Sequence, residues 1–129
     1  MPVTIQYENN KEGIIVTAKG IVNGREFVEK LGEYFQDDEI IQNYRYGLND
    51  FTQVEKFNIS PNQIFSLAKI HIKASKVNQN IIVGFAINKP FIYGMVRIWQ
   101  GYASITGWKI HIEETLPEIQ RWIANNLRL

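Results

Sequence analysis

The sequence predicts a single α/β domain over residues 1–129, with a mixed, mostly parallel sheet and the element order β-β-α-β-α-β-α-β-α. Three observations lead to this prediction. Segments in which apolar and polar residues alternate, as in strands, take turns along the chain with segments whose apolar residues recur every three or four positions, as in helices. This order is typical of βα units. Residues 81–87 are apolar apart from one glycine, as in a parallel strand covered on both faces. A length of 129 residues is also usual for one domain.

The first two strands are expected to form a hairpin. Val3, Ile5 and Tyr7 alternate with polar residues, which predicts a half-buried strand. Residues 9–13 have the composition of a turn, and residues 14–18 form the second strand. The short polar link favours antiparallel pairing, which makes the sheet mixed.

Capping residues mark the first two helices. Asn23 begins the first helix, which Asp37 and Asp38 end, and residues 44–50 form the third strand. Ser60 begins the second helix, because proline follows it and a glutamine lies three positions later. The expected buried face of the first helix is Phe27, Leu31, Tyr34 and Phe35, and that of the second is Ile64, Leu67, Ala68, His71 and Ala74.

The last third of the chain contains two further helices and a strand. Pro90 opens a third helix that ends near Gly107. Residues 109–113 alternate as the fifth strand, and residues 115–118 form another capping box. The last helix then has one buried face, made of Leu116, Ile119, Ile123 and Leu127, with Trp122 beside it.

Charge and composition narrow the function classes. The 14 basic and 13 acidic residues leave a net charge of +1, without the positive excess that nucleic-acid binding requires. The lack of cysteine excludes disulfides and thiolate metal sites. No signal peptide pattern is visible, and the longest apolar run is too short for a transmembrane segment. We therefore expect a cytoplasmic protein that does not bind nucleic acid.

Catalytic and metal-binding motifs are missing from the sequence. His71 and His111 belong to no metal-binding pattern, and we interpret them as a core-edge and a surface histidine. Phosphate-binding loops and nucleophile elbows are also absent. We expect no catalytic residue, no metal and no cofactor. An enzyme of unrecognised type is an alternative, because acid–base pairs are assembled in space rather than in sequence.

The third predicted helix is apolar over most of its circumference. One stripe contains Ile92, Met95, Val96, Trp99 and Ala103, and a second contains Phe91, Ile98, Tyr102 and Ile105. A sheet covers only one side of a helix, so the other side needs a second cover. Three covers fit: the last helix through Trp122, a second subunit, or a small apolar ligand. We expect a homodimer or apolar-ligand surface at Phe91, Met95, Ile98, Trp99 and Tyr102.

Residues 50–61 carry a family resemblance. They read Asp-Phe-Thr-Gln-Val-Glu-Lys-Phe-Asn-Ile-Ser-Pro. This segment and the element order resemble STAS domains, in particular SpoIIAA-like anti-sigma-factor antagonists, whose motif is approximately D-[LF]-[ST]-x-V-x-x-[IMF]-D-S-S-G. The positions that match by type are Asp50, Phe51, Thr52, Val54, Phe57 and Ser60, and those that depart are Asn58, Ile59 and Pro61. Residues 94–102 also look like the third helix of uncharacterised SpoIIAA-like proteins.

The resemblance implies a regulatory function. In family members that switch partners, a kinase phosphorylates the second serine of the motif, which corresponds to Ser60. Asp50, Thr52 and Asn58 would then belong to a partner-binding loop. Helix capping alone also explains Ser60. We predict a non-enzymatic STAS-like binding or regulatory module with a regulatory protein partner. The alternative is a carrier or sensor of a small apolar ligand or lipid.

Overall fold

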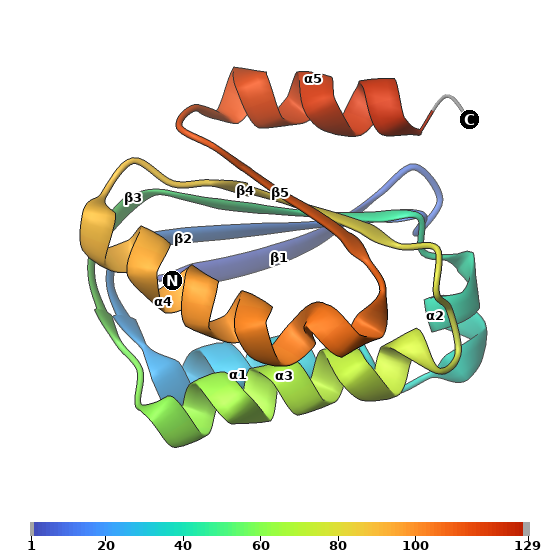
Figure 1. The fold of residues 1–129 in the computed structure, drawn as a ribbon, viewed down its shortest axis with the longest axis horizontal. Coiled ribbons are helices and arrows are strands. Elements are labelled where there is room, and N and C mark those ends of the chain that lie inside the picture. The colour runs from blue at the N-terminus through green and yellow to red at the C-terminus, as the bar shows by residue number, and fades with distance from the viewer. Residues whose placement is uncertain (1, 128–129) are drawn as a thin grey trace.

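A computed structural model describes residues 2–127 as a five-stranded sheet between two layers of helices (Figure 1). The strands lie in the sheet in chain order: β1 (Val3–Glu8), β2 (Gly13–Asn23), β3 (Tyr46–Asn58), β4 (Ile82–Ala86) and β5 (Lys109–Glu113). β1 pairs antiparallel with β2, and the other neighbours pair in parallel. The predicted α/β class with a mixed, mostly parallel sheet is confirmed.

The helices begin largely where capping residues predicted. They are α1 (Gly24–Glu33), α2 (Asp38–Asn43), α3 (Pro61–Ser75), α4 (Pro90–Ala103), which continues into a 3-10 turn (Ser104–Thr106), and α5 (Leu116–Asn126). Asn23, Ser60 and Thr115 each accept a hydrogen bond from the backbone amide three residues later. These bonds satisfy amides that the first helical turn leaves free.

Helices α1, α3 and α4 lie on one face of the sheet, and α5 lies on the other (Figure 1). Each β-α-β connection steps to the next strand in the same direction, and such connections are right-handed. Their helices therefore all lie on one face. α5 follows the last strand and covers the other face, where Ile119 and Ile123 pack on Tyr46, Leu48 and Ala86.

The prediction that the last helix covers α4 through Trp122 is therefore wrong, because the sheet separates the two helices. Trp122 instead stacks on His111, with ring centroids 4.8 Å apart.

Several element boundaries differ from the prediction, and one is the end of the second strand, because β2 continues to Asn23 instead of ending at residue 18. Asp37 does not end a helix but caps α2, accepting bonds from the amides of Glu39 and Ile40. β3 also continues to Asn58, eight residues beyond its predicted end at Asp50. Its pairing with β2 shifts register twice, between Thr17 and Lys19 and between Gly20 and Ile21. These shifts interrupt the alternation by which a strand is recognised.

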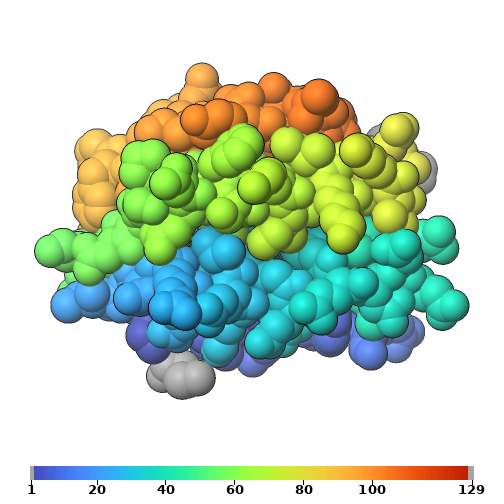
Figure 2. All heavy atoms as spheres, turned by 90° about the horizontal axis from the view of Figure 1, so that it is seen from below, coloured from blue at the N-terminus to red at the C-terminus, as the bar shows by residue number. Residues whose placement is uncertain are grey.

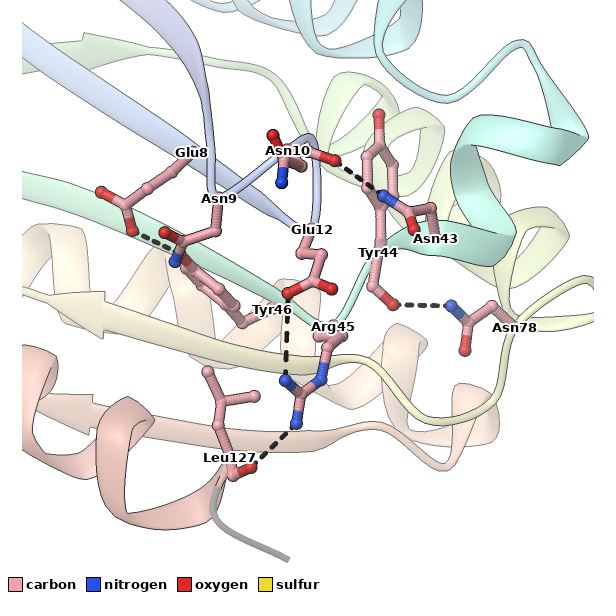
Figure 3. Close-up of polar contacts among 10 residues, drawn as sticks. All are labelled: Glu8, Asn9, Asn10, Glu12, Asn43, Tyr44, Arg45, Tyr46, Asn78 and Leu127. Carbon is pink, nitrogen blue, oxygen red and sulfur yellow. Dashed lines mark hydrogen bonds and ion pairs between the residues drawn. The ribbon is translucent and has the colours of Figure 1, made fainter.

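Polar contacts fix the end of the molecule at which β3 begins (Figure 3). Residues 9–11 turn the β1–β2 hairpin with three successive positive φ angles of 53°, 55° and 65°. Asn43 Nδ2 donates to the carbonyl of Asn10 at 2.9 Å, and an Arg45 guanidinium nitrogen donates to the carbonyl of Leu127 at 2.8 Å. The hairpin, the start of β3 and the end of α5 are thereby joined.

Candidate functional site

The opposite end of the molecule brings two helix N-termini together. Asn23 and Asn58 are register partners where β2 and β3 end, and the chain enters α1 and α3 just beyond them. Gly24, the first residue of α1, packs directly on the backbone that leads from β3 into α3. A Cβ at Gly24 would lie 2.8 Å from both the Asn58 carbonyl oxygen and Ile59 Cα. α1 and α3 therefore begin side by side. Free amides and the helix dipoles make such an end favourable for negative charge.

Ser60 is exposed at this end, where it caps α3. Its Oγ accepts a hydrogen bond from the Gln63 amide at 3.2 Å, and its own amide donates to Gln63 Oε1 at 2.8 Å. The reciprocal pair is the capping box that the sequence predicted. The hydroxyl faces solvent beside the first turn of α3. The role of Ser60 as a phospho-acceptor stays a prediction.

The residues predicted for a partner-binding loop, Asp50, Thr52 and Asn58, lie in strand β3 rather than in a loop, and their role in partner binding stays a prediction. Asp50 is buried and accepts bonds from the Thr52 amide at 3.1 Å and from Thr52 Oγ1 at 2.7 Å. Asn58 lies eight residues further on, roughly 25 Å along an extended strand. The structure places Asn58 next to Ser60 and keeps Asp50 and Thr52 away from both.

α4 has a buried side and an exposed side. Trp99 is buried, and its Nε1 donates to His71 Nδ1 at 3.1 Å. Trp99 is therefore not part of an exposed dimer surface, and Met95 is half-buried. Both line an apolar cavity under α4, so their role at an apolar-ligand surface stays a prediction. The exposed side carries the α4 stripe, which we define as Phe91, Ile98, Tyr102 and Ile105, with exposed fractions of 47%, 52%, 47% and 76%.

The α4 stripe continues onto the neighbouring helix. Phe65 of α3 is 42% exposed, and its ring centroid lies 5.2 Å from that of Tyr102. Figure 2 shows α3 and α4 side by side on this side of the molecule, with α1 beyond α3. Among residues 2–127, therefore, no other part of the chain covers the outer side of α4.

A small cavity lies between the sheet and helices α1, α3 and α4. Its volume is about 80 Å³, and its walls are almost entirely apolar. Asn49 and His71 are polar residues in these walls. The Asn49 side chain donates to the Gly84 carbonyl at 3.4 Å. Burial lowers the pKa of His71 to about 4, so the imidazole is neutral at pH 7 and accepts the bond from Trp99.

A second hollow, a groove of about 350 Å³, runs beside α5 over β1, β2 and β3. It is lined by apolar residues, such as Ile15, Leu48 and Ile123, and by polar ones, among them Glu8, Thr17, Asp50 and Gln120. The buried Tyr46 hydroxyl at one end donates to Glu8, and burial raises the pKa of Tyr46. Sequence reasoning missed this groove. Its residues come from three strands and a helix, and no local pattern joins them.

Residues 2–127 contain neither a metal-binding cluster nor a helix that could span a membrane. In this part of the chain no cluster of three or more His, Asp or Glu residues could hold a metal ion. His111 Nε2 lies 2.6 Å from Glu113 Oε2, so its contact is a single carboxylate. Within the same range, no helix is both long enough and apolar enough to cross a membrane.

The fold is that of SpoIIAA. No protein-family model and no curated protein matches the sequence. The chain is similar to a solved structure of the anti-sigma factor antagonist SpoIIAA in its unphosphorylated form, with a TM-score of 0.62 and 8% identity over 95% of this chain and 97% of that chain. It is also similar to an uncharacterised DUF3478-family protein with a SpoIIAA-like fold from Shewanella loihica PV-4, with a TM-score of 0.53 and 14% identity over 94% of this chain and 91% of that chain. The SpoIIAA-like fold implied by residues 50–61 is confirmed, and at these identities the likeness concerns the fold alone.

Proposed function

We propose that this protein is a non-enzymatic regulatory module, and that it binds a protein partner at the end where α1 and α3 begin. The SpoIIAA-like fold, which extends over 95% of the chain, is the observation that carries the proposal. SpoIIAA itself is an anti-sigma factor antagonist, and its name in that structure specifies an unphosphorylated form. We further propose that phosphorylation of Ser60 regulates the binding of this partner.

The local geometry of Ser60 suits such a control. Its hydroxyl is exposed, so a kinase and a partner have access to it. A phosphate there would add a charge of about −2 beside the amides of the α3 N-terminus, which stabilise negative charge. The surface that a partner meets would change sign locally while the fold stays intact. A partner that fits the neutral end would then be released.

Two substitutions separate this role from helix capping. Aspartate and asparagine cap a helix as well as serine does, and they differ from each other in charge alone. We expect Ser60→Asn to retain the partner in affinity capture from host cells and Ser60→Asp to lose it. Ser60→Asp should be at least as thermally stable as Ser60→Asn, because the helix N-terminus favours negative charge. Ser66→Asp, on the same helix, adds the same charge away from the N-terminus and is expected to retain the partner.

The regulatory proposal would be contradicted in two ways. In the first, Ser60→Asp and Ser60→Asn capture the same proteins in the same amounts. In the second, mass spectrometry of the protein isolated from its host finds Ser60 unmodified under all growth conditions. In the first case the charge at this end does not affect a partner. In the second case capping is the sole role of Ser60.

A small apolar ligand is a second candidate function, which the cavity beside α4 favours. At about 80 Å³ the cavity is too small for an acyl chain, since an engineered cavity of roughly 150 Å³ holds benzene. A ligand of a few heavy atoms with one polar group facing Asn49 fits better. Native mass spectrometry of protein from its own host should show an adduct that Asn49→Leu removes, whereas a bare mass would contradict the carrier function.

A further inference from the structure

Two glycines lie on the exposed side of α4, where the chain itself does not need glycine. Helical geometry places Gly94 and Gly101 within about 60° of Ile98 around the helix axis. Neither has a positive φ, and a Cβ at either position would have no neighbour within 4 Å. Glycine inside a helix costs about 1 kcal/mol relative to alanine. α4 therefore keeps an unfavourable residue twice, although its own packing would accept alanine.

Large and small residues alternate along this side in a self-complementary order. A two-fold axis through Ile98, perpendicular to the helix, places Gly94 opposite Tyr102 of an antiparallel copy. The same axis places Gly101 opposite Met95. Tyr102 and Met95 then each meet a glycine, and each of the two glycines meets a large side chain. An interface between identical subunits requires this reciprocity, because residue i meets j wherever j meets i.

We propose that two copies of this chain associate by antiparallel packing of their α4 helices, with Ile98 on the two-fold axis and Tyr102 of each copy seated on Gly94 of the other. Phe91 of one copy then meets Ile105 of the other, which closes both ends of the α4 stripe. The glycines leave room for Tyr102 and Met95 of the other copy. This association explains why glycine is present at positions 94 and 101.

The size and charge of the surface fit a second copy. Phe65 and the four residues of the α4 stripe are 42–76% exposed. Large side chains with about half their area exposed give roughly 500 Å² per copy, or about 1,000 Å² in total, which is the lower bound for a specific interface. The α4 stripe contains no charged side chain. Arg97 lies 6.0 Å from the Tyr93 ring centroid and Lys69 Nζ lies 5.0 Å from the Phe65 ring centroid, so both charges stand at exposed edges of the surface.

Opposite charges at position 98 test the two-fold axis directly. Ile98 is 52% exposed, so charged substitutions should leave the monomer folded. We expect sedimentation velocity at micromolar concentration to show a dimer for the wild type. Ile98→Glu and Ile98→Lys should each raise the dissociation constant at least about 100-fold, because like charges then face each other. An equimolar mixture of the two variants should restore the dimer.

The glycines provide a second readout, in which stability and association change in opposite directions. Gly94→Ala should stabilise the monomer, measured in the Ile98→Glu background, and weaken association of the otherwise unchanged chain. Gly32→Ala in α1 is the matched control, since its Cβ would make an ordinary 3.7 Å contact with Ile70 and should leave association unchanged.

Three results would overturn the dimer: a wild type that stays monomeric, a dimer that persists in Ile98→Glu, or a mixture of the charged variants that stays monomeric. The last result would also point to a different occupant of the α4 stripe. Ser60→Asp should leave the sedimentation profile unchanged, so the dimer and the regulatory role of Ser60 fail separately.

Discussion

At the scale of single residues, His71 shows how an ionisable side chain is made part of an apolar core. Its ring lies 5.2–5.6 Å from the rings of Phe35, Trp99 and Trp108, centroid to centroid. Trp99 Nε1 donates to its Nδ1. Protonation would place a charge among these rings and would remove the acceptor that Trp99 uses. Burial therefore lowers the pKa of His71 from 6.5 to about 4.

The free energy of unfolding should depend on pH through His71. Because its folded pKa lies below its unfolded value, its contribution is fully present above pH 6.5 and is lost as the pH falls toward 4. We expect a loss of up to about 3 kcal/mol over this window. Urea denaturation from pH 7.5 to 4 measures it. His71→Gln should flatten the profile.

At the scale of elements, Gly84 determines how closely α5 packs on the sheet. A Cβ at this position of β4 would lie 2.6 Å from Ile119 Cγ1 and 3.2 Å from Ile123 Cδ1. The glycine thus provides the space that these two isoleucines occupy. This contact sets how closely α5 approaches the sheet, beside the packing of Ile119 and Ile123 on Tyr46, Leu48 and Ala86.

Gly84→Ala should therefore displace α5 and lower the free energy of unfolding by about 1–3 kcal/mol. Gly47→Ala in β3 is the matched control. A Cβ there would have no neighbour within 4 Å, so we expect no loss or a small gain of about 0.5 kcal/mol. Chemical denaturation of both variants measures the difference. Equal stabilities would show that α5 shifts without cost.

Element boundaries were predictable where a side chain closes a helix and unpredictable where the backbone is irregular. Asn23, Ser60 and Thr115 were recognisable because a cap and its partner lie three residues apart in sequence. α2 was missed because its six residues are too few to show a helical period. The second half of β3 was missed because register shifts break its alternation.

At the scale of the whole molecule, the sheet divides the apolar interior into two cores. The larger lies under α1, α3 and α4, and the smaller lies under α5. Ile92 in the first and Ile119 in the second are both fully buried. The apolar character of these residues was predictable from helical spacing. The division was not, because it depends on the order of strands and the handedness of their connections.

The two cores should contribute to stability independently. Ile92→Val and Ile119→Val each remove one methylene, and each should cost about 0.5–1.5 kcal/mol. Since the sheet separates the two sites, the double variant should lose the sum of the two within about 0.5 kcal/mol. Urea denaturation of the four proteins tests this additivity. A larger deviation would show that α5 and α4 are coupled through the strands.

The candidate site was only partly predictable for the same reason. Ser60 was recognisable from its local motif, and the apolar side of α4 from its period of 3.6 residues. That Asp50 lies far from Ser60 depends on β3 continuing as a strand to Asn58, and that the outer side of α4 faces solvent depends on the path of strands distant in sequence. The groove beside α5 has the same origin.

The order of the strands in the sheet also bears on how the chain is made. Because strand order follows chain order, every strand after the first pairs with the edge of the strand synthesised before it. During translation the growing chain can thus extend its sheet one strand at a time, without waiting for a distant segment. Until β5 emerges from the ribosome, β4 is an unpaired edge that could template aggregation, and pairing with Lys109–Glu113 then covers it.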